Sequence, residues 1–189
     1  PRRRRGACAA TPPPRPVPPP RRPRRGLRGE AQAVFLERKK LVPKDDFIWG
    51  NNSCKAILGV VTPMVEGEIL VAEGKIDEAA AQLREAIAAE DSLKYDEPPG
   101  WLIPVRHSLG AVLMDNGRLA EAEQVYRDDL ARLPDNGWSL YGLAESLRMQ
   151  NKDAKESEAI RAKFKQVWAG ADTQITSSCL CQPGTVVKD

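Results

Sequence analysis

The group best suited to acid/base chemistry near neutral pH is His107, because it is the only histidine in the chain. A histidine can take up or release a proton at a reacting group when a nucleophile or a second titratable group accompanies it. The sequence offers no activated nucleophile, no partner at metal-ligand spacing and no phosphate-binding glycine loop. We therefore expect His107 to act as a hydrogen-bonding residue, and we assign no catalytic, cofactor or metal residue.

A second candidate for chemistry is the C-x-C pair Cys179 and Cys181. Two thiols at this spacing can bind a soft metal or interconvert with a disulfide. They do not complete a zinc site, and the other cysteines, Cys8 and Cys54, are far away in the sequence. We expect inert thiols in a reducing compartment. The alternative is a redox- or metal-responsive module that uses Cys179 and Cys181.

The third candidate is the basic segment 1–28, which contains ten arginines, nine prolines and no acidic residue. Residues 29–189 carry a net charge of −7, so the sequence pI of 8.8 reflects the tail alone. The segment has almost no large apolar side chains to bury, so we expect it to be disordered with polyproline II character. Alternatives are nucleic-acid tethering through residues 2–28, and a proline-rich motif such as Pro12-x-x-Arg15.

Localisation signals are sparse. No run of about 18 apolar residues is present, so no membrane span is expected. The basic tail lacks the apolar core of a secretory signal, and it resembles a transit segment in its arginines and alanines but contains no serine. A cytoplasmic location is favoured and organelle targeting is the alternative. Because Met64 is the first methionine, we expect a fragment, a processed product or an odd gene model.

A register of 34 residues organises the elements that would position these groups. Leu109, Gly110 and Leu113 recur 34 residues later as Leu143, Ala144 and Leu147. Small residues at such marks let two antiparallel helices approach closely, and larger residues fill the space beside them. The full set of marks is Gly67, Leu70, Gly74, Ala79, Leu83, Ala86, Leu109, Gly110, Leu113, Gly117, Ala122, Tyr126, Pro134, Leu143, Ala144 and Leu147.

These marks predict three pairs of helices. The pairs are 53–73 with 76–90, 102–116 with 119–133, and 137–150 with 153–169. About nine residues are inserted near 91–101, where two prolines and a glycine exclude a helix. Ala31, Phe35 and Pro43 keep the intervals of a second helix, so segment 29–41 is expected to be half of an earlier unit. Its partner helix would occupy 12–26, but the arginines and prolines there do not favour a helix, so we expect this partner to be missing. Either the repeat array continues N-terminally, or segment 29–41 acts as a cap.

The pattern of Leu109-Gly110, Gly117, Ala122, Tyr126 and Pro134 resembles the tetratricopeptide repeat. The resemblance covers about 29–169, with a half unit at 29–45 and full units near 53–90, 102–134 and 137–169, followed by a tail at 170–189. Glu90-Asp91, the segment 95–99 and the segment 136–140 look like a bacterial and algal subgroup. Arg106 and Glu156 depart from the pattern. The resemblance implies an all-α, right-handed solenoid of antiparallel helix pairs.

The same resemblance implies a concave groove along the first helix of each unit. Its residues would be Met64, Glu68, His107, Met114, Trp138, Tyr141, Glu145 and Arg148, with Asp115 and Glu145 near His107. Such a surface suits a peptide or helix of a protein partner. Glu68 disfavours a carboxylate ligand. We expect a non-catalytic protein-interaction scaffold, unless a missing N-terminal unit or the C-terminal tail covers this face.

Overall fold

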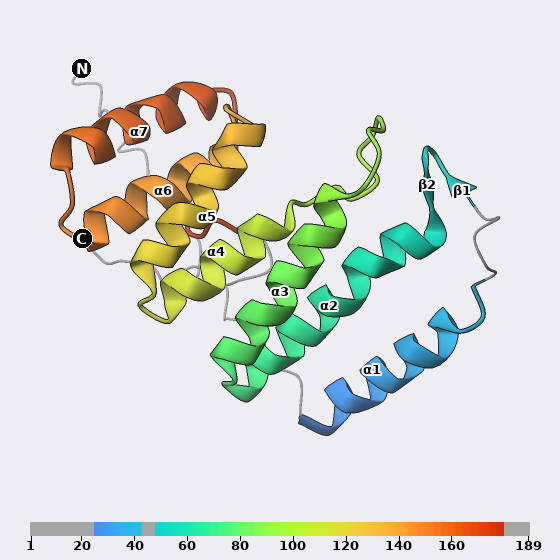
Figure 1. The fold of residues 1–189 in the computed structure, drawn as a ribbon. Coiled ribbons are helices and arrows are strands. Elements are labelled where there is room, and N and C mark those ends of the chain that lie inside the picture. Colours follow the sequence, from blue (N-terminus) through green and yellow to red (C-terminus); the bar gives the residue numbers. More distant parts are fainter. Residues whose placement is uncertain (1–24, 43–47, 180–189) are drawn as a thin grey trace, which may run out of the picture.

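The computed structural model describes residues 25–42 and 48–179, and over this part the chain is all-α apart from one two-stranded ribbon (Figure 1). The ribbon pairs β1 with β2 antiparallel, Trp49 opposite Asn52. In chain order the elements are α1 (Arg25–Lys39), β1 (Ile48–Trp49), β2 (Asn52–Ser53), α2 (Cys54–Glu73), α3 (Ile76–Asp91), α4 (Val105–Asp115), α5 (Leu119–Arg132), α6 (Gly137–Met149) and α7 (Ala154–Val167).

The helices lie close to the segments that the 34-residue register predicts, and the residues that end them explain why. Gly74 follows α2 with a φ of 80° and Gly117 follows α4 with a φ of 72°, a left-handed conformation that favours glycine. One boundary differs: α1 begins at Arg25, so the last residues of the expected disordered tail are helical. The rest of that tail, and most of the expected partner segment 12–26, lies outside the described residues.

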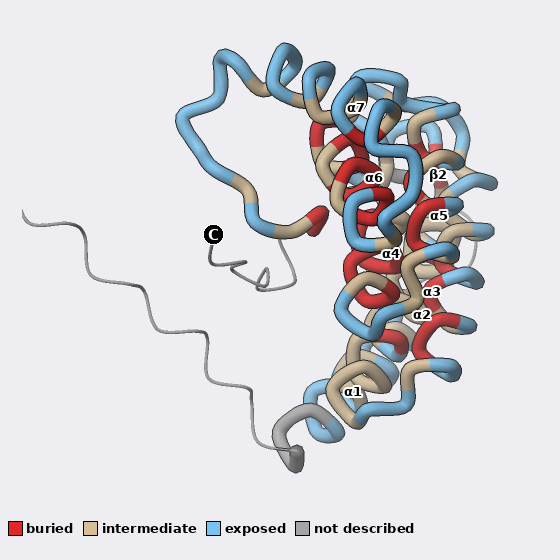
Figure 2. Tube along the Cα trace, turned by 90° about the vertical axis from the view of Figure 1, so that its left-hand side faces the viewer, coloured by how far each residue is buried: buried red, intermediate tan, exposed pale blue. Residues whose placement is uncertain are grey.

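Each helix from α2 to α7 packs against the next one along the chain, and α4 also contacts α6. Figure 2 shows the buried residues running through the centre of this stack, and the outer turns of α7 exposed. Helix α1 contacts α2 only sparsely, and none of its described residues is buried. The core cluster consists of Val60, Ala80, Leu83, Ala86, Val105, Leu109, Val112, Leu113, Ala122, Tyr126, Leu143 and Leu147.

The small residues of the register occupy the points of closest helix approach, as the sequence predicts. A methyl group built on Gly67 would lie 2.9 Å from Cγ of Leu83, on the neighbouring helix α3. On Gly110 it would overlap the ring of Tyr126. Ala122 and Ala144 are buried. Packing at interior density leaves no room for added atoms at such points, which fixes how the paired helices sit.

The inserted segment between α3 and α4 is held by the ribbon that precedes α2. The side chain of Asn52 donates to the carbonyl of Lys94 at 2.9 Å and accepts from its N–H at 2.7 Å. The backbone N–H of Asn51 donates to Asp96 at 2.8 Å. The insert is therefore an ordered loop, as expected, although the ribbon that orders it is not evident from the sequence.

Within the described ranges, no helix combines the length and the apolar character that a membrane crossing requires.

Candidate binding groove

A cavity of about 370 Å³ lies between α4 and α6, and we call it the α4–α6 groove. Four of the predicted groove residues line it: Met114 from α4, and Tyr141, Glu145 and Arg148 from α6. The exposed side chain of Met149 also contributes. These residues stand up to 35 positions apart in the sequence, and the packing of α4 against α6 brings them to one surface.

The chain's own C-terminal segment forms the remaining wall of the groove. After α7 ends, the indole N–H of Trp168 donates to the carbonyl of Thr173 at 2.7 Å, and the chain turns back toward α4 and α6 (Figure 2). Thr176, Ser177 and Ser178 line the cavity. Exposure falls to 3% at Ser178 and 2% at Cys179. The segment is therefore seated against the helices over its last described residues.

The seat for this segment is built around the hydroxyl group of Tyr126. The ring of Tyr126 lies against both Gly110 and Gly142, since a methyl group on either glycine would overlap it. Because both glycines lack a side chain, the Tyr126 ring can extend from α5 to the groove, where its hydroxyl oxygen lies 2.6 Å from Oγ of Ser178. Burial raises the pKa of Tyr126, with the Ser178 hydrogen bond opposing that effect, so the phenol stays protonated and can donate.

A second contact holds the end of the described segment. The Oγ atom of Ser108, on α4, lies 3.5 Å from Sγ of Cys179, and both side chains are buried. Cys179 is also disulfide-bonded, whereas Cys54 is a free thiol. Cys181, its neighbour in the predicted C-x-C pair, lies outside the described residues. Cys179 is thus seated against α4, directly after the residues that line the groove.

Two of the predicted groove aromatics pack against α7. Trp138 stands edge-on to Trp168 with ring centroids 5.6 Å apart, and Tyr141 stands edge-on to Phe164 at 5.7 Å. Phe164 and Trp168 stack on each other. Such edge and stacked pairs stabilise helix packing beyond the area they bury. The contacts of Trp138 are therefore those of an intramolecular aromatic cluster, and Tyr141 serves both this cluster and the groove.

His107 is buried, with 4% exposure, in a polar network that joins three helices. Its Nε2 atom lies 2.7 Å from the amide nitrogen of Asn136, which also donates to Asp129 at 2.8 Å. Ser139 donates to the same Asp129 oxygen at 2.6 Å. Because an amide nitrogen only donates, His107 accepts through Nε2. The hydrogen-bonding role expected for His107 is present, but its partner is Asn136, with Asp129 beside it.

Charged groups at the groove are already engaged with one another. Glu145 accepts from Arg148 of the same helix at 2.8 Å and from Arg161 of α7 at 2.5 Å. The Arg148 side chain remains 44% exposed. An exposed guanidinium in a monodentate pair retains donors for a further acceptor, so Arg148 can contact a ligand without breaking this pair.

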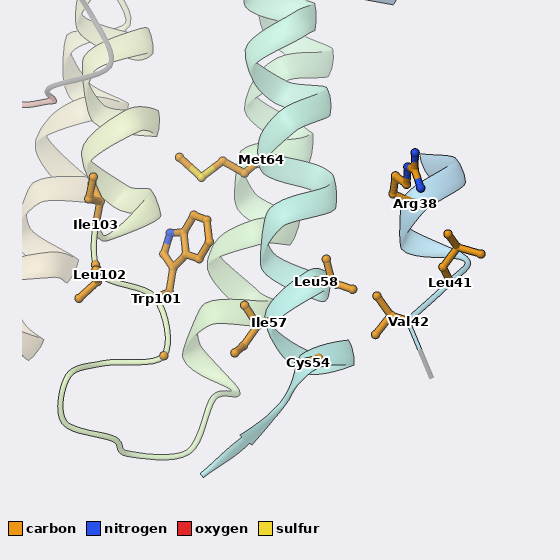
Figure 3. Close-up of a pocket in the computed structure, with 11 residues that line it drawn as sticks. Arg38, Leu41, Val42, Cys54, Ile57, Leu58, Met64, Trp101, Leu102 and Ile103 are labelled. Carbon is orange, nitrogen blue, oxygen red and sulfur yellow. The ribbon is translucent and has the colours of Figure 1, made fainter. Parts of the chain in front are cut away.

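A larger apolar cavity of about 900 Å³, the α1–α2 cavity, is lined by residues of α2, of the end of α1 and the turn after it, and of the loop between α3 and α4 (Figure 3). Met64 of α2 lines it together with Trp101 and Ile103 of the inserted loop. Leu58 and Leu41 line it on the side of α1. Of the predicted groove residues, Met64 lines this cavity and four line the α4–α6 groove. Glu68, His107 and Trp138 line neither, so the expected single groove is wrong.

Glu68 lies one turn beyond Met64 on α2 and is half-buried. Burial raises the pKa of its carboxyl group, because a charged carboxylate loses hydration in an apolar setting. A carboxylate ligand would add a second negative charge nearby.

Sequence reasoning missed the residues that only tertiary structure brings together. Gly142, Ser108 and Ser178 complete the seat around Tyr126, and none belongs to the repeat marks. A signal did exist for Gly142, because it stands 34 residues after Ser108, so a small residue occupies the same repeat position on α4 and α6. Asn136 and Asp129 were not assigned as partners of His107, since they lie on later elements. The arginine-rich segment 2–24 lies outside the described residues.

Among the residues described here, no three His, Cys, Asp or Glu side chains gather as they would around a metal ion. No protein-family model, curated protein or solved structure matches the chain.

Proposed function

We propose that this chain is a tetratricopeptide-like α-solenoid segment that binds a peptide or helix of a protein partner and catalyses no reaction. The supporting observation is the convergence of Met114, Tyr141, Glu145 and Arg148 on one cavity, beside which an irregular stretch of the chain itself, Thr176–Ser178, is seated. A surface that accommodates a backbone and its side chains in this way has the character of a peptide-binding groove.

The chemistry of the α4–α6 groove suits a peptide better than a reaction. Its histidine neighbour, His107, is buried and hydrogen-bonded, so it is unavailable to a substrate. Its polar groups are a phenol, hydroxyls and an ion pair, all of which recognise polypeptides. Met114 and Met149 add flexible apolar contacts that adapt to different side chains. We propose no nucleophile or acid/base pair.

The test is affinity capture with the full chain from an extract of its source cells, followed by identification of the partner. We expect Met149→Ala and Arg148→Ala each to weaken binding by roughly 1 kcal/mol or more, as at contact residues of ordinary interfaces. Gln124→Ala and Lys155→Ala, at exposed positions outside the groove lining, serve as matched controls. Equal binding by all four variants would remove the groove from the proposal.

The same capture distinguishes nucleic-acid tethering through the arginine-rich tail. Binding through apolar and hydrogen-bonding contacts should change little between about 50 and 200 mM salt, whereas phosphate contacts lose several orders of magnitude in affinity over that range. Deleting residues 1–24 should leave groove binding intact. Binding that is lost both with salt and with this deletion would favour the tail.

A redox-responsive module is the second candidate, and it is favoured by the disulfide at buried Cys179. Reduction by an added dithiol would return Cys179 to a thiol and remove whatever constraint the disulfide places on this segment. We expect a protease to cleave the chain near Ser177 faster after reduction than before it. Cleavage at the same rate with and without reductant would discard this candidate.

A further inference from the structure

The contacts that seat the C-terminal segment are made by hydroxyl groups and, at Cys179, by a sulfur atom. The phenol of Tyr126 meets Oγ of Ser178, and Oγ of Ser108 meets Sγ of Cys179. All four side chains are buried, so each polar group has lost its contact with water and gained a contact with its partner. A buried polar group needs such a partner. An apolar side chain at position 178 would leave the Tyr126 hydroxyl without one.

The seat also selects for small side chains. Ser178 is 3% exposed and Cys179 is 2% exposed, so little space surrounds either side chain. The hydroxyl of Tyr126 reaches this point because Gly110 and Gly142 leave a passage for its ring. A ligand must therefore present two small side chains in succession, the first of them a hydroxyl.

The seated segment has no helix or strand of its own, so once the Cys179 disulfide is reduced its place depends on these contacts and on its tether. Residues 173–179 are irregular, and the Trp168–Thr173 hydrogen bond anchors their start next to α7. A short tether gives a segment an effective concentration in the millimolar range. Contacts that are weak for a free peptide are then sufficient to keep the segment in place, and a free peptide must compete with it.

We propose that Thr176–Cys179 is an intramolecular ligand of the α4–α6 groove, and that the groove binds in trans a peptide segment without helix or strand that presents two successive small side chains, the first of them hydroxyl-bearing. This rests on the proposed function and deepens it by giving the chemical class of the ligand. The C-terminal segment competes for the site, so a partner gains access as the segment leaves.

The test uses the full chain under reducing conditions and a fluorescent peptide with the sequence of residues 172–179, with serine in place of the final cysteine. In the chain, Ser178→Glu places a charge at the buried seat and should release the tethered segment. If the segment fills the groove in 90–99% of molecules, release should tighten peptide binding by about 10- to 100-fold. Thr173→Glu is the matched control, because it adds the same charge at an exposed position of the same segment.

The Tyr126 hydroxyl should account for part of this binding. Adding Tyr126→Phe to the Ser178→Glu chain should lower the affinity for the peptide by about fivefold, which is the effect of losing one neutral hydrogen bond. A peptide in which alanine replaces the residue equivalent to Ser178 should bind the Ser178→Glu chain with a similarly lowered affinity. Equal peptide binding by the unmodified chain and the Ser178→Glu chain, with helical content unchanged, would overturn the proposal.

If Ser178→Glu prevents folding, amide hydrogen exchange of the Tyr126→Phe chain decides the question. The proposal expects faster exchange at residues 177–179 with little change elsewhere, and unchanged exchange there would contradict it. The peptide measurement is independent of the partner capture described above. If capture through Met149 and Arg148 persists while the peptide fails to bind, the proposed function stands and this inference falls.

Discussion

The hydroxyl oxygen of Tyr126 lies 2.6 Å from Oγ of Ser178, a hydrogen bond between residues 52 positions apart. Tyr126 belongs to α5, yet its ring passes Gly110 of α4 and Gly142 of α6 to reach the surface where Ser178 is seated. One side chain thus links the packing of three helices to the occupancy of the groove.

Burial raises the pKa of Tyr126, so stability should depend on pH in the alkaline range. Below about pH 10 the phenol is protonated in both states, and its contribution is fully present. Above that pH the unfolded state releases the proton while the folded state keeps it, so the free energy of unfolding falls as pH rises. Urea unfolding from about pH 9 to about pH 11 measures this fall. Tyr126→Phe should make it smaller, although Tyr95 and Tyr141, whose pKa values are also raised, keep part of it.

Gly142→Ala should destabilise the chain, because the added methyl group overlaps the Tyr126 ring. Overpacking of this kind costs about 1–3 kcal/mol. The matched control is Gly59→Ala in α2, where the nearest side-chain atom would be 4.0 Å away. There the change should stabilise by up to about 1 kcal/mol, because alanine favours a helix more than glycine does. Thermal unfolding compares the two, and effects of the same sign and size would contradict the close approach at Gly142.

Ser139→Ala should lower the free energy of unfolding, because it removes one hydrogen bond of the polar network around His107. The Ser139 hydroxyl donates to the buried carboxylate of Asp129 at 2.6 Å. Removing a donor from a buried charged acceptor costs about 1–3 kcal/mol. Ser92→Ala, which removes an exposed hydroxyl bonded to the carbonyl of Ala89, should stay within about 0.5 kcal/mol. Denaturant unfolding of both variants gives the comparison, and a neutral Ser139→Ala would show that this network does not stabilise the fold.

Glu68→Gln should raise the free energy of unfolding at pH 7. Burial raises the pKa of Glu68, so the folded state favours the protonated form. Its contribution to stability is present below the unfolded pKa and is lost as pH rises through the folded pKa. The gain from Gln should therefore shrink as the pH is lowered toward about 4. Glu66→Gln, at an exposed position of the same helix, is the matched control.

Much of the helical organisation could be predicted from the sequence, because its signals are local. Gly74 and Gly117 end helices, and Pro98 and Pro99 keep the insert out of a helix. The 34-residue spacing of small and large residues then pairs the helices. These features can be recognised from the sequence alone, because each affects only its own turn of the chain or the adjacent helix.

The candidate site was less accessible to sequence reasoning because its contacts are long-range. The β1–β2 ribbon is ordered by hydrogen bonds from Asn52 to Lys94, across 42 residues. The seat of Ser178 depends on three helices at once. Trp138 follows the repeat position of a groove residue, yet Trp168 covers it from α7. Position within a repeat indicates which face a residue lies on, and the neighbouring elements decide what covers that face.

The most direct test of the account places a photo-crosslinking amino acid at Met149, which lines the α4–α6 groove and is 46% exposed. The control places it at Gln124, an exposed position of α5 outside the groove lining. After irradiation with an extract of the source cells, the account predicts a discrete protein adduct at position 149, a stronger adduct when Ser178→Glu releases the C-terminal segment, and none at position 124. Adducts of equal yield at the two positions, or none at 149 in either background, would contradict binding through this groove.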